Sequence, residues 1–143
     1  MKYDPNCLFC KIAAGEIPSF KIYENDRVLV FADIAPLNPG HCLVIPKSHS
    51  ENLYDISLED LVAVHQAAQK AALALKSTLK QPGLTIIQLN GRGANQVIMH
   101  YHVHLVPRDR SKDGLDKLDW ESTPGDMGKI KALTEKVAAA IKG

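Results

Sequence analysis

The amino-acid sequence predicts an α+β domain in which helices pack on an antiparallel sheet of about five strands. Three short β-rich runs follow one another in the first third of the chain, and consecutive short strands favour antiparallel pairing. Two longer segments repeat apolar residues at helical spacing. With 143 residues, 45% of them hydrophobic, the chain can bury the core of one domain spanning residues 1–143.

Turn residues and helix-ending residues divide the chain into these elements. Gly15 ends a short first helix, and the pair Asn25-Asp26 makes a turn between two β-rich runs. Pro36 and Pro39 keep the loop before the third strand irregular, because proline has no backbone N–H to give to a sheet. The elements expected in chain order are a helix over 7–14, strands over 20–23, 28–31 and 41–45, a helix over 57–80, strands over 84–89 and 98–106, and a helix over 126–142.

The segment from Ser57 to about Lys80 gives the clearest helix. Ser57 and Asp60 have the spacing of a capping box, and Pro82-Gly83 lies just beyond the end of the helix. Its apolar residues recur at helical spacing, so we expect them to form the face that packs on the sheet. This stripe comprises Leu58, Leu61, Val62, His65, Ala68, Ala72, Leu75 and Leu79.

Charge and hydropathy exclude several classes of partner. The chain carries 17 basic and 16 acidic side chains, and this balance gives no electrostatic reason to expect nucleic acid or an anionic membrane. No apolar run approaches the roughly 20 residues that a membrane span requires. The segment at residues 1–6 lacks the apolar core of a signal peptide, so a cytoplasmic protein is expected.

Three of the six histidines, His100, His102 and His104, lie within five residues of a predicted strand. Alternate side chains of a strand share a face, so these imidazoles should point one way while Tyr101 and Val103 point into the core. Neighbouring histidines would then be roughly 6–7 Å apart at their Cα atoms. Histidine has no special preference for strands, so metal binding or catalysis is favoured over a solvated strand face.

The three cysteines suggest a metal or redox pair rather than a disulfide framework. Their odd number argues against a set of disulfides. Cys7 and Cys10 are separated by two residues, which is typical of a metal-binding pair or a redox pair. Cys42 lies in an apolar strand and is expected to be buried.

The run His100-Tyr101-His102-Val103-His104-Leu105-Val106 resembles the signature of the histidine triad (HIT) family. The resemblance is strongest to the Hint branch, covers residues 7 to about 110, and leaves a C-terminal extension. It implies a HIT-like fold and a homodimer. Other landmarks of the family follow in the same order: Cys7-Leu8-Phe9-Cys10-Lys11-Ile12, Glu16-Ile17-Pro18, Val30-Phe31-Ala32-Asp33-Ile34, Pro39-Gly40-His41, Val44-Ile45-Pro46-Lys47-Ser48-His49 and Asn90-Gly91.

The resemblance implies a hydrolase that acts at the α-phosphate of a nucleotide. His102 would attack phosphorus and form a nucleotidyl-histidine, which water would resolve. His104 would lie near the phosphate or leaving group, and His41 would have a supporting role. Attack requires one ring nitrogen of His102 to keep its lone pair while the other donates its hydrogen to a fixed acceptor. A backbone carbonyl of the same strand is the expected acceptor.

The favoured reaction is hydrolysis of a purine nucleoside phosphoramidate, which releases AMP or GMP. One alternative is a dinucleoside polyphosphate hydrolase. Another, from a different class, is a nucleotide-binding interaction module with negligible turnover. The intact triad argues against the second alternative.

Seven residues match the family's nucleotide site. Asp33 is suited to accept hydrogen bonds from both ribose hydroxyls, and Asn90 and Gln96 would be neutral donors to phosphate oxygens. Asn95 replaces a glycine that is usual beside this glutamine, and Val97 replaces a serine or threonine of several relatives, which removes a hydroxyl near the leaving group. The matched residues are Phe31, Asp33, Ile34, Leu43, Asn90, Gln96 and His104.

The resemblance also implies a structural zinc site. Some HIT proteins with a cysteine pair bind zinc through two further histidines, which are His49 and His100 in this sequence. With Cys7 and Cys10 they make a closed set of four ligands, as in structural zinc sites. The ion would join the N-terminal helix to the strand that carries the nucleophile.

Trp120 is expected in a C-terminal loop on the leaving-group side.

Overall fold

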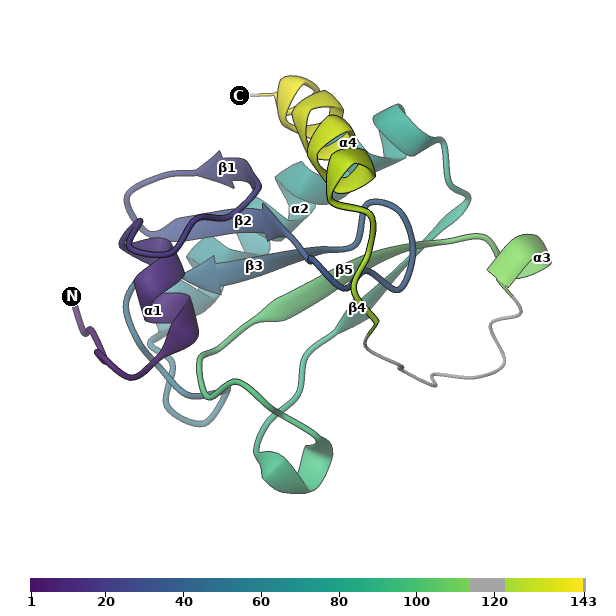
Figure 1. Cartoon of the computed structure of the whole chain (residues 1–143). Coiled ribbons are helices and arrows are strands. Elements are labelled where there is room, and N and C mark those ends of the chain that lie inside the picture. The colour runs from purple at the N-terminus through teal and green to yellow at the C-terminus, as the bar shows by residue number, and fades with distance from the viewer. Residues whose placement is uncertain (114–122, 143) are drawn as a thin grey trace.

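The computed structural model describes residues 1–113 and 123–142. Five strands form one sheet in the order β1-β2-β3-β5-β4, and every neighbouring pair is antiparallel (Figure 1). The predicted α+β class and the sheet of five strands are therefore confirmed. The strands are β1 (Lys21–Glu24), β2 (Val28–Ala32), β3 (Cys42–Pro46), β4 (Gly83–Ile87) and β5 (Val103–Arg108).

The three predicted helices are present, and two short ones were not predicted. Each short helix spans too few residues to show apolar periodicity, so no periodic pattern could predict it. None of the helices within residues 1–113 and 123–142 has the length and apolarity that crossing a bilayer requires. The helices are α1 (Leu8–Ala13), α2 (Leu58–Leu79), the 3₁₀ turn η1 (Arg92–Ala94), α3 (Arg110–Asp113) and α4 (Met127–Ala139).

Side-chain caps and one glycine determine where the helices begin and end. The Ser57 side chain accepts a hydrogen bond from the backbone N–H of Asp60, so the predicted cap of α2 is formed. Asp126 caps α4 in the same way through the N–H groups of Gly128 and Lys129. Gly15, just after α1, has a φ of 78°, a left-handed conformation that glycine adopts without strain.

Both faces of the central strands are covered. Side chains of β2, β3 and β5 that point to one face belong to a core shared with α4 and with α2, which lies behind the sheet in Figure 1. Side chains that point to the other face pack around α1. The first set includes Val28, Val30, Cys42, Val44, Val103 and Leu105, and the second Leu29, Phe31, Leu43 and Ile45. The expected burial of Cys42 and the inward orientation of Tyr101 and Val103 are confirmed.

The stripe predicted for α2 is wrong in part. Leu75 and Ala68 face the sheet as expected, but Leu58 and Val62 are 75% and 47% exposed, and His65 is also exposed. Small side chains take much of the inner face and allow the helix to lie close to the sheet, so apolar size did not identify that face. The buried residues are Val64, Ala67, Ala68, Ala71, Ala74 and Leu75.

The loop between β2 and β3 is held at both ends. Gly40 has a φ of 90°, and a Cβ there would lie 2.6 Å from Cδ1 of Leu79, so any other residue would strain the backbone and displace the Leu79 side chain. At the other end, the N–H of Gly125 donates to the carbonyl of Ile34, beside the start of α4. These contacts fix the segment that carries His41.

Candidate functional site

The fold gathers five of the six histidines into two neighbouring clusters. The metal cluster contains Cys7, Cys10, His49 and His100. The histidine cluster contains His41, His102 and His104, with the carboxylate of Asp33 at its edge. The sixth histidine, His65, is exposed on α2 and is part of neither cluster.

The four residues of the metal cluster have the geometry of a zinc site. Sγ of Cys7 is 3.3 Å from Nδ1 of His100, and Sγ of Cys10 is 3.3 Å from Nδ1 of His49. All four ligand atoms lie within 4.8 Å of one another. Zinc bound tetrahedrally by sulfur at about 2.3 Å and nitrogen at about 2.0 Å holds such atoms roughly 3.5 Å apart. The side chains fit a closed Cys2His2 zinc site.

The proton of His100 is placed so that the ring can bind a metal. Nε2 of His100 is 2.8 Å from the carbonyl oxygen of Pro46, an atom that can only accept, so Nε2 carries the hydrogen. Nδ1 therefore keeps its lone pair and faces the two cysteines. Burial lowers the pKa of His100 to about 4, which keeps the ring neutral.

His100 departs from the predicted strand. β5 begins only at Val103, and the chain bends at residues 98–100, so the expectation of a strand over 98–106 with three histidines on one face is wrong at its start. The bend directs His100 to the cysteines, while His102 and His104 lie side by side, with ring centroids 5.0 Å apart. The contacts of its Nδ1 with the two cysteines and the hydrogen bond of its Nε2 to Pro46 account for this departure from regular pairing.

The ring of His102 is oriented by the backbone of His100. Its Nδ1 is 2.6 Å from the carbonyl oxygen of His100, so Nδ1 donates its hydrogen and Nε2 keeps its lone pair. A backbone carbonyl close by in the chain was the expected acceptor. Burial lowers the pKa of His102, although the hydrogen bond to His100 and the charge of Asp33 oppose this. The ring is neutral near pH 7, with one nitrogen free for nucleophilic attack.

Phe9 is a site residue that the sequence analysis did not identify. Its ring packs edge to face on His102, with centroids 5.1 Å apart, and also contacts the rings of His100 and Phe31. Phe9 lies between the two cysteines of α1, so the metal cluster that anchors the helix also positions this contact. Its place inside the Cys7-Leu8-Phe9-Cys10 run was the available signal.

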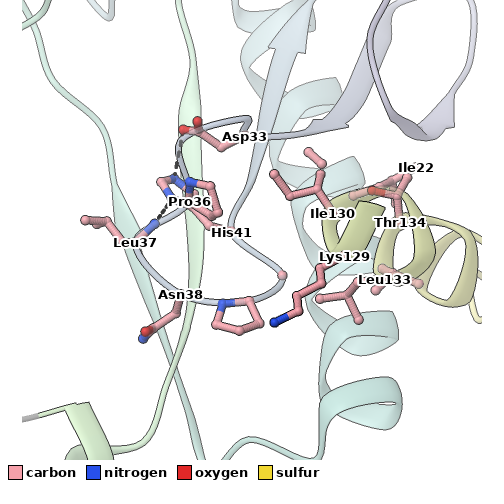
Figure 2. A pocket seen from close by; sticks show the side chains of 14 residues that line it. Ile22, Asp33, Pro36, Leu37, Asn38, His41, Lys129, Ile130, Leu133 and Thr134 are labelled. Carbon is pink, nitrogen blue, oxygen red and sulfur yellow. Dashed lines mark hydrogen bonds and ion pairs between the residues drawn. The ribbon is translucent and has the colours of Figure 1, made fainter. Parts of the chain in front are cut away.

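A chain of hydrogen bonds places the protons of His41 and His104. The backbone N–H of Leu37 donates to Nδ1 of His41 over 3.0 Å, so Nε2 of His41 carries the ring hydrogen (Figure 2). Nε2 of His41 is 3.0 Å from Nδ1 of His104 and 3.4 Å from Oδ2 of Asp33. When His104 accepts this hydrogen, its own hydrogen lies on Nε2.

The position of the His41 ring hydrogen indicates which of the two clusters can bind a metal ion. Asp33, His41 and His104 also bring three possible ligand atoms within 4.8 Å of one another. A metal needs the lone pair of a ring nitrogen, and in His41 the Nε2 lone pair is taken by hydrogen because Nδ1 accepts from Leu37. In His100 the backbone fixes the opposite arrangement. We therefore interpret the first group as a hydrogen-bonded chain and the Cys/His group as the metal site.

Burial keeps the other two histidines of the cluster neutral as well. Burial, together with the adjacent His102 and His41, lowers the pKa of His104 to about 2. It also lowers the pKa of His41, against the opposing charge of Asp33. Because the neutral ring of His104 carries one N–H, it can donate a hydrogen bond to an anionic group without first being protonated.

A cavity lies beside this hydrogen-bonded chain. It has a volume of ≈ 280 Å³ and separates the loop at residues 36–40 from α4, with Ile130 and Leu133 on one wall and Asp33 and His41 on the other (Figure 2). On this side the loop is not packed tightly against the helix. Its position therefore depends on polar contacts such as the one between Leu37 and His41.

Three of the predicted pocket residues lie in a row across the sheet beside the histidines. Phe31 is opposite Leu43, and Leu43 is opposite His104 in the strand register. Phe31 and Leu43 are buried, whereas Ile34, in the loop after β2, is 58% exposed. This row of buried apolar side chains ends at His104, and Asp33 directly follows β2.

The two predicted amide residues hold the loops beside the histidine cluster. Both Nε2 hydrogens of Gln96 are used by the carbonyls of Glu51 and Ile98, and its Oε1 accepts from the N–H of Gly91. Asn90 bonds to Gln88 and to the N–H of Leu53. In this arrangement Gln96 is a loop-organising residue, and its expected bond to phosphate would require one of these contacts to break.

The two departures from the family pattern have different consequences. Asn95 has a φ of 66°, a left-handed conformation, and asparagine is among the few residues other than glycine that tolerate it. The loop is therefore preserved. Val97 is 78% exposed and offers no hydroxyl. Trp120, expected near the leaving group, lies outside the described residues.

Comparison with known proteins identifies the family. The model of the HIT domain matches residues 14–111. The chain is 42% identical over 140 residues to Protein hit of Bacillus subtilis, which covers 94% of this chain and 96% of the relative. It is 36% identical over 137 residues to the adenosine 5′-monophosphoramidase hnt1 of Schizosaccharomyces pombe, covering 96% and 99% of the two chains.

A solved structure agrees with the sequence comparison. A zinc-bound histidine triad family protein of Mycobacterium smegmatis superimposes with a TM-score of 0.80 at 33% identity, over 95% of this chain and 93% of the other. The similarity thus extends beyond the matched domain to most of the chain. The chain belongs to the histidine triad (HIT) family.

Proposed function

We propose that this protein is a hydrolase that releases a nucleoside monophosphate from purine nucleoside phosphoramidates through a covalent intermediate on His102. The observation that carries the proposal is the hydrogen bond from Nδ1 of His102 to the carbonyl of His100, which leaves Nε2 with a lone pair beside an apolar row. The relative named adenosine 5′-monophosphoramidase supports the same reaction.

The roles of the other residues follow from their positions. The purine would lie on Phe31, Ile34 and Leu43, with the ribose hydroxyls donating to Asp33. Nε2 of His102 forms a bond to the α-phosphorus as the bond to the leaving amine breaks, and the amine takes a proton. Nε2–H of His104 would stabilise the phosphate or leaving group. Water then cleaves the histidine–phosphorus bond and releases AMP or GMP.

We also propose that the metal cluster holds a structural zinc ion. Zinc would bind Cys7, Cys10, His49 and His100, which leaves no open position for substrate. It would supply a link between α1, which carries Phe9, and the backbone carbonyl that orients His102. Two of the three free cysteines then serve as ligands, which suits the reducing cytoplasm, and cell fractionation would test that location.

A homodimer is a further part of the proposal. Leu58, Val62 and Leu73 are exposed on α2, and Ile86 is exposed on β4, the strand at the edge of the sheet. Exposed apolar side chains and an unpaired edge strand are both features that an interface between chains can cover. Because Leu133 and Val137 pack α4 into the same core as α2, we treat the C-terminal extension as part of one domain.

Replacing the nucleophile should abolish turnover. We expect His102→Ala to lower kcat for adenosine phosphoramidate by at least about a thousandfold, because the variant lacks the imidazole that attacks phosphorus. The matched control is His65→Ala, which removes a histidine outside both clusters and should leave kcat unchanged. Mass spectrometry of quenched wild-type protein should find nucleotide on His102. Unchanged turnover in His102→Ala would rule out the covalent route.

Substrate choice separates the proposal from its two alternatives. A phosphoramidase should hydrolyse adenosine phosphoramidate much faster than diadenosine polyphosphates. The reverse order would identify a dinucleoside polyphosphate hydrolase, and AMP binding without turnover of either substrate would identify an interaction module.

The pH profile should report the low pKa of His102. Protonation fills the Nε2 lone pair, so activity is lost as pH falls through the pKa, and burial places that pKa below 6.5. We expect kcat/KM to stay level down through pH 6.5 and to fall only in more acidic solution. In Asp33→Asn, which removes a charge that raises this pKa, the acid limb should lie lower still. A limb above pH 6.5 would contradict this assignment.

Metal analysis tests the zinc site. Protein purified without chelators should contain about one zinc ion per chain. Cys10→Ala should lose the metal and unfold at a lower temperature, because the apo cluster no longer joins α1 to the strand. Cys42→Ala, which removes the cysteine outside the cluster, should keep it. Wild-type protein without metal, or Cys10→Ala with a full complement, would exclude the site.

Sedimentation equilibrium tests the dimer. We expect the wild-type protein to have about twice the mass of one chain. Leu73→Glu places a charge on the exposed face of α2 and should shift the protein towards monomer. Leu53→Glu, at an exposed apolar residue in the loop before α2, should remain dimeric. A monomeric wild type would refute the interface.

A further inference from the structure

One ring hydrogen of His41 has two acceptors within reach. Nδ1 of His41 accepts the N–H of Leu37, so the ring has a single hydrogen to give, on Nε2. That atom is 3.0 Å from Nδ1 of His104 and 3.4 Å from Oδ2 of Asp33. The hydrogen bond is made to His104, and the carboxylate of Asp33 competes for the same hydrogen from 3.4 Å because it is charged.

The carboxylate is held so that one oxygen faces the histidine. Oδ1 of Asp33 accepts the N–H of Ala35 over 2.8 Å, which leaves Oδ2 towards His41 (Figure 2). The side chain of Asp33 retains some solvent exposure, whereas His41 is buried. A ligand can therefore reach the carboxylate, and the Nε2 hydrogen of His41 faces both Asp33 and His104.

We propose that Asp33 and His41 couple ribose binding to the hydrogen bond that His104 accepts. The ribose hydroxyls then increase the rate of reaction as well as the affinity. A hydroxyl that donates to Oδ2 of Asp33 weakens the attraction of this oxygen for the His41 hydrogen. The hydrogen bond from His41 to Nδ1 of His104 then becomes stronger, and it holds the hydrogen of His104 on Nε2, towards the phosphate. Asp33 is thereby a specificity residue for ribonucleotides over deoxyribonucleotides, and His41 is a positioning residue.

This inference rests on the proposed function, and it makes a distinctive kinetic prediction. Replacing adenosine phosphoramidate by its 2′,3′-dideoxy analogue should raise KM and also lower kcat of the wild type by about threefold to tenfold, the effect of one hydrogen bond. If Asp33 only bound the sugar and phosphate chemistry were independent of it, kcat would be the same for both substrates.

The Asp33→Asn variant distinguishes this proposal from a role of Asp33 in ribose binding alone. The amide oxygen can still accept from Ala35, but the group facing His41 becomes NH2, which cannot accept. The His41 hydrogen then bonds to His104 whether or not a hydroxyl is present. For the dideoxy analogue, kcat of Asp33→Asn should exceed that of the wild type several-fold. KM should not improve, because this substrate has no hydroxyl to bind.

A second variant checks that the effect passes through His41. The Asn side chain of His41→Asn can accept from Leu37 but is too short to donate to His104. In this background the ribose and dideoxy substrates should have equal kcat and still differ in KM. An equal kcat for the two substrates in the wild type, or a kcat difference that persists in His41→Asn, would overturn the proposal.

Nuclear magnetic resonance gives a readout that does not need turnover. With ¹⁵N-labelled histidine, the scalar coupling between Nε2 of His41 and Nδ1 of His104 should grow when AMP binds and change less with 2′,3′-dideoxyadenosine monophosphate. If the wild type releases no AMP from the phosphoramidate, the proposed function fails, but this coupling still decides the inference. Equal couplings with the two ligands, or no binding of AMP, would overturn it.

Discussion

The site depends on one hydrogen bond, between the ring of His102 and the backbone carbonyl of His100. The same residue offers its side chain to the metal cluster and its carbonyl to the nucleophile. Through Phe9, the helix that carries the two cysteines also packs on the nucleophile. The segment 100–102 thus links the metal cluster to the histidine cluster, so a change in the structure of one cluster should affect the other.

Backbone groups in this site determine which ring nitrogen of each histidine carries the hydrogen. The carbonyls of Pro46 and His100 accept from the first two triad histidines, and the N–H of Leu37 donates to His41. In the proposed function, the same side-chain type thereby serves as a metal ligand, a nucleophile and a hydrogen donor within one small volume. Burial, which lowers the pKa of each ring, keeps these assignments intact near neutral pH.

Periodicity and short motifs predicted the fold and most of the site. The sheet, the three main helices and the cap at Ser57 follow local rules, and the two histidine groups were named from the sequence. Three features could not be predicted. The bend at His100 is imposed by distant partners, the inner face of α2 is chosen by close packing of alanines, and the saturation of Gln96 depends on carbonyls far along the chain.

An orienting group made of peptide backbone has a consequence for mutational robustness. In a catalytic triad the acceptor behind the histidine is a carboxylate, and one codon change can delete it. Here the acceptor is the carbonyl of residue 100, which every amino acid possesses. Substitution at that position can remove the metal ligand but leaves the carbonyl atom in the chain. This hydrogen bond therefore depends on the path of the main chain at residue 100. That path is determined jointly by the residues that bend the chain, so no single side chain encodes the contact.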